Sequence, residues 1–222
     1  MEKRNKIFTY INNIFFIAVI ITCIVLAVVF KLSPLTTISC IAGILYVVFL
    51  SNRSILNFII GLISSTTYII VAFQARLFGE VIFYLLIDLP MIFISFFMWK
   101  KHIGKDLKVE SRKLSLKQIL IILTISIFTV WGYAWFLKLI GGVNVVVDSI
   151  STVVSFIATM LMALRYREQW LLWVIVYLVS IIMWATTFDL LMLIMSGSCF
   201  ISCFVGYVNW SLGIKKQNSN KN

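Results

Sequence analysis

The chain has 222 residues, of which 62% are hydrophobic and 12% are charged, and its formal net charge is +11. A soluble domain of this size cannot bury so much apolar surface, so the composition excludes a soluble globular protein and indicates a membrane protein with several spans. The positive charge would suggest nucleic acid in a soluble protein, but its placement along this chain matters more than its sum, and we expect no nucleic-acid partner.

Apolar runs long enough to cross a bilayer occur eight times along the chain. We predict transmembrane helices at residues 12–30, 35–50, 54–73, 78–98, 118–137, 146–163, 168–187 and 190–210. The first run follows a basic N-terminus, as a secretory signal does, but it is long for such a signal and no small-residue cleavage site follows. We therefore expect it to be a transmembrane helix.

The basic residues are distributed unevenly between the loops. With a cytoplasmic N-terminus, only Lys31, Arg76 and Lys138 fall in outer segments. Sixteen of the nineteen basic residues fall in inner segments, namely Lys3, Arg4, Lys6, Arg53, Lys100, Lys101, Lys105, Lys108, Arg112, Lys113, Lys117, Arg165, Arg167, Lys215, Lys216 and Lys221. This excess predicts that both termini are cytoplasmic and that the basic segments contact anionic membrane lipid of the inner leaflet.

The polar interval at residues 100–117 divides the chain into two halves that resemble each other. Comparison of the halves places Ile38-Ser39 on Ile150-Ser151, Asn57 on Trp173, Gly61 on Tyr177, Tyr68 on Trp184 and Trp99 on Trp210. Three spans at 35–98 are thus repeated at 146–210, and one further span separates the copies, so both copies enter the membrane in the same direction. Such a parallel repeat predicts a substrate site at the repeat interface, near the membrane midplane.

The expected fold is therefore an all-α integral membrane protein with two parallel three-helix repeats joined by a linking helix, plus one extra N-terminal transmembrane helix. The predicted segments are 1–30 for the cytoplasmic N-terminus and extra helix, 31–99 for the first repeat, 100–140 for the basic loop and linking helix, 141–212 for the second repeat, and 213–222 for a basic cytoplasmic tail.

Asp88 is the acidic residue nearest the middle of a predicted span. An ionised carboxylate there costs several kcal/mol unless it faces a wet cavity or a partner. Pro90, two residues later, frees a backbone carbonyl nearby. Asp88 therefore either forms a structural hydrogen bond or serves the substrate or a gate.

Other polar residues in or near the predicted spans have either a structural or a functional interpretation. The hydroxyl residues at 64–67 favour close helix packing, and Tyr68 follows them. Asn57 and Gln169 begin predicted helices, where a capping role competes with substrate binding. Glu80, Asp148 and Asp189 lie at outer ends of spans, where they are either solvated charges or acids that favour entry of a cation.

The span that begins after Arg167 carries the most distinctive pattern of the chain. Trp170, Trp173, Tyr177 and Trp184 fall on one helix face because their spacing is three, four and seven residues. This face either packs at a membrane interface or in a helix seam, or stacks a flat, neutral or cationic aromatic ligand in a dry cavity.

Several chemistries find no support in the sequence. There is no P-loop, so the chain does not power itself with ATP, and no metal-ligand spacing, so we expect no cofactor. Cysteines 23, 40, 199 and 203 lie inside predicted spans and favour packing. The fragment at 195–199 lacks a nearby base, since the only histidine is His102 in the polar loop. An integral-membrane enzyme or a purely structural subunit is therefore disfavoured.

Two segments resemble a known family of membrane transporters. DSISTV at 148–153 and RYREQWLLW at 165–173 resemble the second-repeat signature of the PnuC family of bacterial vitamin transporters. LFGE at 77–80 and MWKK at 98–101 are similar to the family's equivalent first-repeat loop and helix end. The resemblance covers about residues 35–212.

This resemblance implies a three-plus-one-plus-three helix arrangement, similar to that of SWEET sugar transporters, in a homotrimer with one pathway per protomer. It implies uniport of nicotinamide riboside into the cytoplasm for NAD salvage, with trapping by a cytoplasmic nucleoside or vitamin kinase. Relatives that take thiamine, riboflavin or deoxynucleosides keep those substrates open as alternatives. The family pattern places substrate contacts at Gln169, Trp170, Trp173, Tyr177 and Asp88.

The chemistry of the riboside fits the same region. A flat cationic pyridinium can stack on Trp173 or Trp184, each contact contributing about 1–2 kcal/mol in a desolvated pocket. The ribose hydroxyls need hydrogen-bond partners such as Tyr177 or Asn57. The expected substrate-binding residues are Trp173, Tyr177, Gln169, Trp170, Trp184, Asp88, Asn57 and Tyr68.

Overall fold

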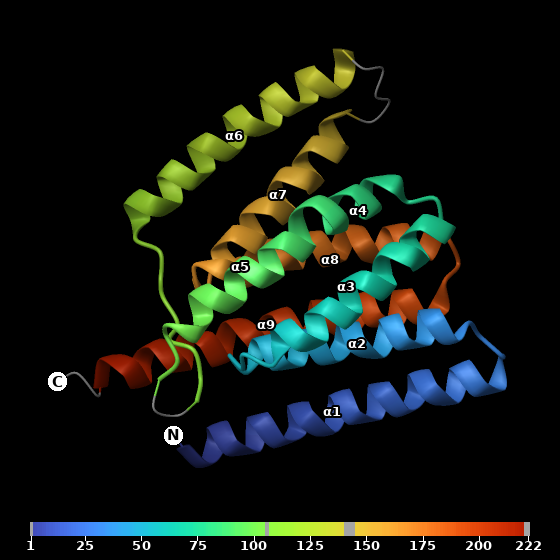
Figure 1. Ribbon diagram of the computed structural model, residues 1–222. Helices are drawn as coiled ribbons and strands as arrows, with labels where there is room; N and C mark the ends of the chain where they lie inside the picture. The colour runs from blue at the N-terminus through green and yellow to red at the C-terminus, as the bar shows by residue number, and fades with distance from the viewer. Residues whose placement is uncertain (1, 105–106, 140–144, 220–222) are drawn as a thin grey trace.

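The computed structural model describes residues 2–104, 107–139 and 145–219, and these are helical apart from short connections (Figure 1). The helices are α1 (Glu2–Val29), α2 (Pro34–Ser51), α3 (Asn57–Gln74), α4 (Phe78–Phe83), a π-helical turn η1 (Tyr84–Asp88), α5 (Leu89–Lys100), α6 (Leu116–Leu139), α7 (Val145–Ala163), α8 (Gln169–Thr186) and α9 (Leu190–Ser219). Both ends of the chain lie at the same end of the bundle, which we call the terminal end (Figure 1).

Each predicted span coincides with a helical segment, and the fourth is made of α4, η1 and α5 in succession. Within the described residues, six segments are long and apolar enough to cross a membrane. The remaining two helices contain the shorter apolar stretches Ile14–Val29 and Ser149–Ala163. The prediction of an all-helical membrane protein with several spans is confirmed. The predicted boundary at residues 140 and 141 lies outside the described residues.

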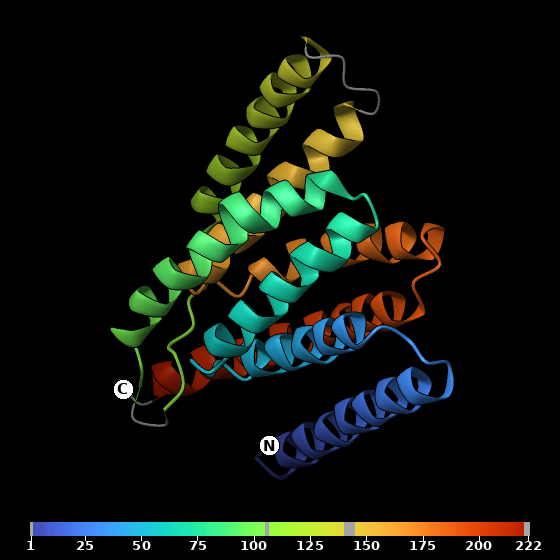
Figure 2. The same ribbon diagram turned by 45° about the vertical axis from the view of Figure 1, so that its right-hand side comes forward.

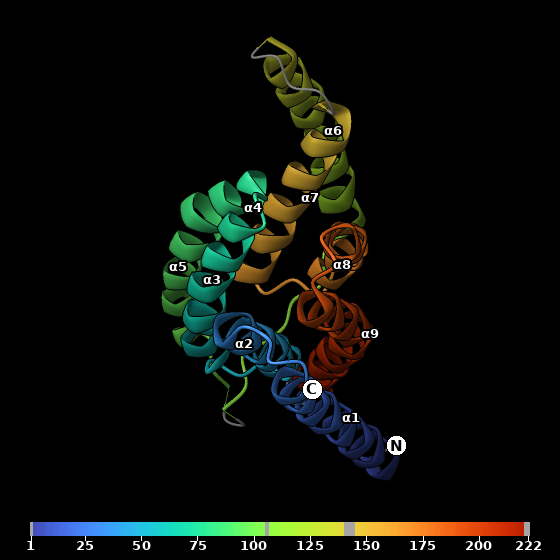
Figure 3. The same cartoon turned by 90° about the vertical axis from the view of Figure 1, so that its right-hand side faces the viewer.

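Six helical segments form a ring. Around the ring, α2 packs on α3, α3 on α5, α5 on α7, α7 on α8, α8 on α9, and α9 on α2 (Figure 3). Two helices lie outside the ring, since α1 packs along α2 and α9, whereas α6 packs mainly on α7 at the far edge (Figure 2). We call α2 to α5 the first half of the ring and α7 to α9 the second half.

The turns of the two halves have matching backbone geometry. Arg53 and Arg165 both have positive φ, at 59° and 64°, and Arg165 lies 112 positions after Arg53. Arg76 and Phe188 repeat this relation in the next turn, with φ of 61° and 56°. Positive φ is uncommon for residues other than glycine, so its recurrence at one spacing indicates that the two halves bend in the same way.

Two tryptophans connect the halves reciprocally. Trp99 Nε1 donates to the carbonyl oxygen of Met162 in the second half at 3.1 Å, and Trp210 Nε1 donates to that of Leu50 in the first half at 3.1 Å. Met162 lies 112 positions after Leu50, whereas Trp210 lies 111 positions after Trp99. The difference of one residue follows η1, because a π-helical turn accommodates one extra residue.

The structure confirms the predicted match of Trp99 with Trp210 but corrects the register of α3 and α8. Both helices have 18 residues, and they begin at Asn57 and Gln169. Asn57 therefore corresponds to Gln169, and the predicted matches of Asn57 with Trp173, Gly61 with Tyr177 and Tyr68 with Trp184 are wrong by one helical turn. The sequence comparison aligned aromatic residues, whereas the turns set the register.

The segment at residues 107–115, which we call the strap, crosses the terminal end between α5 and α6. The Val109 N–H donates to the carbonyl oxygen of Arg53 at 3.0 Å, and the Arg112 N–H donates to that of Arg165 at 2.8 Å. The Leu114 N–H donates to Glu168 Oε2 at 3.1 Å. The strap therefore joins the α2–α3 turn to the α7–α8 turn.

Candidate functional site

The aromatic face of α8 points into the ring of helices. Trp170 and Trp184 are fully buried, Trp173 is 9% exposed, and Tyr177 is half-buried. The exposed aliphatic residues of α8 are Leu171, Ile175, Leu178, Val179 and Ile182. Because the aromatic side chains face the protein, their interpretation as a lipid-facing interfacial belt is wrong, and helix packing and ligand binding remain.

Trp170 packs α8 against α9 within the second half, near the terminal end. Its ring lies against the backbone of Gly206, where a Cβ atom would collide with the indole. The buried rings of Phe58, Trp99, Trp210 and Trp170 follow one another at centroid distances of 5.0, 5.6 and 6.2 Å. Trp170 and Phe58 occupy matching positions on α8 and α3, so each half contributes an equivalent pair of rings to this cluster.

A hydrogen-bond chain joins the halves toward the other end of the bundle. Trp184 Nε1 donates to the hydroxyl of Tyr68 at 3.2 Å, and this hydroxyl donates to Glu80 Oε2 at 3.2 Å. The Tyr68 ring also lies 4.4 Å from the ring of Tyr84. The interpretation of Glu80 as a solvated charge is therefore wrong, because its carboxylate accepts a hydrogen bond from the interior.

The sequence also placed Asp189 and Asp148 at this end, and the structure describes the side chain of Asp189 alone. Asp189 Oδ1 accepts a hydrogen bond from the Met192 N–H at 3.1 Å, so it caps the first turn of α9. The side chain of Asp148 lies outside the described residues. A role for these acids in attracting a cation stays a prediction.

Asp88 lies at the last position of η1 and is 7% exposed. Its Oδ2 accepts a hydrogen bond from Ser65 Oγ of α3 at 2.5 Å, so the structural hydrogen bond expected as one alternative is present. Among the described residues, Asp88 forms no ion pair. A buried carboxylate without a cationic partner is costly in a membrane, and it offers a cationic ligand a favourable contact.

Three tyrosines from different helices lie near one another, and two of them lie near Asp88. Tyr46 of α2, Tyr84 of η1 and Tyr177 of α8 lie within electrostatic range of one another, and Tyr46 and Tyr84 also lie within range of Asp88. The Tyr46 hydroxyl approaches the Met162 sulfur at 3.2 Å. Tyr46 and Tyr84 are absent from the sequence-based set, since each is a single tyrosine in an apolar span and no spacing links them.

Several buried polar atoms on α3 and α8 have no hydrogen-bond partner among the described residues. They include Trp173 Nε1, Asn57 Oδ1 and both amide atoms of Gln169. The predicted capping role of the two amides is not found, because α3 and α8 have no side-chain capping bond. Buried polar groups are ordinarily paired, so these atoms offer donors and acceptors to a bound molecule.

The site residues expected from the sequence thus differ in their contacts. Trp173, Gln169 and Asn57, and also Trp170 through its Nε1 atom, carry buried polar atoms without a partner among the described residues. Tyr177 lies beside Trp173, and Asp88 bonds to Ser65. Trp184 instead bonds to Tyr68 across the halves, whereas the ring of Trp170 packs on Gly206 within the second half.

The described residues favour packing roles elsewhere. The Ser196 and Ser198 hydroxyls donate to carbonyl oxygens of their own helix, those of Met192 and Ile194, so they are not arranged as nucleophiles. The four cysteines are free and buried, as the packing interpretation expects. No group of His, Cys, Asp or Glu among the described residues could hold a metal ion.

The chain is similar to known transport proteins over most of its length. The family model described as nicotinamide mononucleotide transporter matches residues 33–212. A protein named nicotinamide riboside transporter PnuC from Neisseria mucosa is 33% identical over 206 residues, covering 86% of this chain and 78% of that protein. The PnuC of Haemophilus influenzae is 34% identical over 189 residues, covering 84% and 83%.

A solved structure has the same fold. The crystal structure of the vitamin B3 transporter PnuC superposes with a TM-score of 0.86 at 31% sequence identity, and the match covers 93% of this chain and 92% of that one.

Proposed function

Because the chain belongs to the PnuC family of membrane transporters, we propose that it carries nicotinamide riboside into the cytoplasm for NAD salvage, by facilitated diffusion as a uniporter. The relatives from Neisseria mucosa and Haemophilus influenzae are named nicotinamide riboside transporters.

The inward-facing ring of Trp173 is the observation that carries the proposal. Trp173 is nearly buried, its Nε1 atom is unpaired among the described residues, and its ring centroid lies 5.8 Å from that of Tyr177. A pyridinium is flat and positively charged, so it gains from stacking on an indole in a desolvated site.

Polar groups on the same helix as Trp173 and on the first half complement the rest of the riboside in this proposal. The Asp88 carboxylate supplies negative charge for the cationic ring, and it has no ion-pair partner among the described residues. The side-chain amide of Gln169 and the Oδ1 atom of Asn57, which are unpaired among the described residues, offer hydrogen bonds to ribose hydroxyls. Since the described spans place no basic side chain beside Asp88, the site favours the unphosphorylated nucleoside over the nucleotide.

The arrangement of the helices supports a transport pathway between two parallel three-helix repeats. The matching turns at Arg53 and Arg165, and the reciprocal bonds of Trp99 and Trp210, support a repeat with α6 as the linking helix and α1 as an extra helix. In this proposal the terminal end faces the cytoplasm of a bacterial cell, in agreement with the concentration of basic residues there.

The direction of net uptake comes from chemistry outside the protein. A uniporter equilibrates its substrate, so a cytoplasmic kinase that phosphorylates the riboside keeps the inward gradient. We further propose that the protein assembles as a homotrimer with one pathway in each protomer, as the family resemblance implies.

Uptake into proteoliposomes that contain only this protein tests the function. We expect saturable influx of labelled nicotinamide riboside without ATP or an ion gradient. Trp173→Ala should reduce uptake at low substrate concentration by about tenfold, because a lost stacking contact of 1–2 kcal/mol corresponds to roughly that factor. Trp135→Ala is the matched control, since Trp135 is exposed on α6, and it should transport normally.

Ligand-induced thermal stabilisation identifies the substrate among related molecules. A ligand that binds only the folded protein raises the melting temperature by mass action, so nicotinamide riboside should stabilise the protein more than thiamine, riboflavin or deoxynucleosides. Stronger stabilisation by one of the others would reassign the substrate within the same fold. Absence of saturable flux for all of them would reject the transport proposal.

A further inference from the structure

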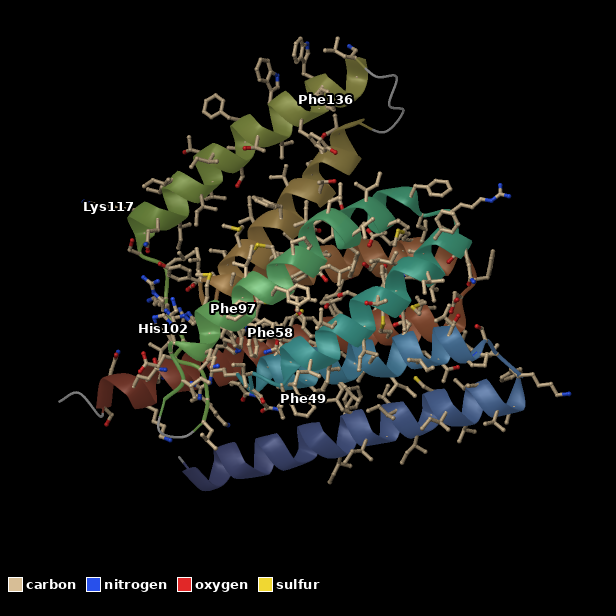
Figure 4. The ribbon with its side chains drawn as sticks, in the orientation of Figure 1. Phe49, Phe58, Phe97, His102, Lys117 and Phe136 are labelled. Carbon is tan, nitrogen blue, oxygen red and sulfur yellow. The ribbon has the colours of Figure 1, made fainter. Side chains whose placement is uncertain are left out.

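Arginines gather where the strap crosses the terminal end, and one of them has no hydrogen-bond or ion-pair partner in the part of the chain that the structure describes. Figure 4 shows side-chain nitrogen atoms near His102 in this region. Arg165, in the α7–α8 turn, is 7% exposed, and among the described residues its guanidinium makes no hydrogen bond or ion pair. A guanidinium in so little-exposed a side chain loses part of its hydration, so an anionic acceptor beside it would be favourable.

Two neighbouring arginines are already engaged, unlike Arg165. The Arg167 guanidinium bonds to Glu168 Oε1 at 3.0 Å and to Ser211 Oγ at 3.1 Å. The Arg53 guanidinium donates to the carbonyl oxygen of Val109 at 3.2 Å and lies against Gly213. The surrounding protein thus satisfies Arg167 and Arg53, whereas no described residue accepts a hydrogen bond from the Arg165 side chain.

Further donors lie beside Arg165. Arg112 is exposed, its Cζ atom lies 4.7 Å from the ring centroid of Tyr166, and its N–H donates to the carbonyl oxygen of Arg165 at 2.8 Å. The preceding residue, Ser111, has a buried hydroxyl with no partner among the described residues. The side-chain amide of Gln217 holds the Ser111 N–H and carbonyl oxygen at 3.0 Å each, so α9 fixes the backbone of the strap at Ser111.

The local charges repel one another. Burial, and next the positive charge of Arg112, lower the pKa of the Arg165 guanidinium. Glu110 acts in the opposite direction, but it is exposed. The region thus has two positively charged guanidinium groups and the Ser111 hydroxyl, which is unpaired among the described residues, and the one carboxylate that acts on Arg165 there is that of the exposed Glu110. Such a combination favours the binding of an anion. Phosphate suits it, because its oxygens match the planar donor pairs of guanidinium groups.

We propose that Arg165, Arg112 and the Ser111 hydroxyl form a binding site for a phosphate group at the terminal end of the protein. The phosphate belongs either to an anionic phospholipid headgroup of the adjacent leaflet or to a soluble phosphate compound, since both present the same oxygens. Its occupant contacts both the strap and the α7–α8 turn, and it therefore holds the strap against the second half. This proposal is independent of which vitamin the protein carries.

Thermal unfolding of the purified full-length protein in neutral detergent tests the soluble source. We compare inorganic phosphate with chloride at equal ionic strength. Native mass spectrometry with phosphatidylglycerol and phosphatidylcholine in the same micelles tests the lipid source. Saturable stabilisation by phosphate supports a soluble ligand, and retention of phosphatidylglycerol over phosphatidylcholine supports a headgroup. Absence of both responses overturns the site.

Arg165→Gln should weaken whichever response the wild type shows by at least tenfold. Arg76→Gln is the matched control, because Arg76 also has positive φ in a helix–helix turn but is exposed in the turn between α3 and α4, and it should respond like the wild type. Should Arg165→Gln fail to fold, Arg112→Ala replaces it, since that side chain is exposed and the backbone N–H is kept. Wild-type binding in the folded variants would overturn the proposal.

Discussion

Gly206 shows how one missing side chain sets the distance between two helices. A Cβ atom at this position of α9 would collide with the six-membered ring of Trp170, which the buried aromatic cluster holds in place. We predict that Gly206→Ala lowers the free energy of unfolding by roughly 1–3 kcal/mol, the usual effect of overpacking. Gly197→Ala on the same helix is the control, because no atom lies within 4 Å of its added Cβ.

Chemical denaturation in detergent, followed by tryptophan fluorescence, measures this difference. Gly197→Ala should be neutral or slightly stabilising, since alanine favours a helix over glycine by about 1 kcal/mol. Equal stability of the two variants would mean that Trp170 moves aside without loss.

Asp88 separates the effect of charge from that of hydrogen bonding. Asp88→Asn keeps an oxygen that accepts from Ser65 but removes the negative charge. Removing the negative charge removes its attraction for the cationic pyridinium, so we predict that this variant binds nicotinamide riboside about tenfold more weakly, a factor equivalent to about 1.4 kcal/mol. Its affinity for the uncharged reduced riboside should be unchanged, and isothermal titration measures both. Equal affinity of Asp88→Asn and the wild type for the cation would exclude a role for the charge.

At the scale of elements, the strap has little regular structure of its own, and its hydrogen bonds hold it to both halves. Arg112→Pro removes the N–H that bonds to the carbonyl of Arg165, whereas Arg112→Ala removes the same side chain and keeps this N–H. We predict that the proline variant is less stable than the alanine variant by about 1 kcal/mol, the net contribution of one hydrogen bond. Its amides at residues 165–167 should also exchange hydrogen faster.

Lys113→Pro controls for the stiffness of proline in the strap, since the Lys113 N–H makes no hydrogen bond among the described residues. This variant should exchange like the wild type at residues 165–167. Faster exchange there in Lys113→Pro would show that any proline loosens the strap, independently of the Arg165 bond.

The sequence predicts the helices well because a membrane requires long apolar segments, and each predicted span contains one. Register and irregular turns are harder to predict. The aromatic residues of α8 suggested a match of Asn57 with Trp173, but the positive-φ turns at Arg53 and Arg165 define a spacing of 112. The residues of η1 suit an α-helix equally well, so the π-helical turn that carries Asp88 leaves no sequence signal.

In the candidate site, too, features within one helix were predictable from the sequence, whereas contacts between helices were not. The face of α8 was predictable because Trp173 and Tyr177 share one helix at helical spacing. Tyr46 and Tyr84 come from two other elements, and only the closing of the ring brings their hydroxyls toward Tyr177. The contribution of Tyr68 was predicted as ligand binding, whereas its hydroxyl is engaged by Trp184 and Glu80.

For the molecule as a whole, the two halves of the ring meet at two junctions. Each junction has the same two contacts, namely packing of one helix on another and a tryptophan hydrogen bond. The first helix of each half packs on the last helix of the other, α2 on α9 and α7 on α5. The tryptophan bonds of Trp99 and Trp210 lie at these two junctions. A movement that opens the ring at one end therefore has equivalent contacts to break on both sides, which suits a transporter that alternates between two openings.

The orientation of the whole molecule in the membrane decides which opening faces the cytoplasm. Sixteen of nineteen basic residues belong to segments on the side of the termini, and retention of Lys and Arg in the cytoplasm predicts that this side is internal. Ser33 and Ser219 are both exposed and mark opposite ends of the bundle. We predict that Ser33→Cys reacts with a membrane-impermeant maleimide in intact cells, and that Ser219→Cys reacts only after lysis. The wild type gives a low background, since its four cysteines are buried, and the reverse labelling pattern would invert the topology and the proposed direction of release.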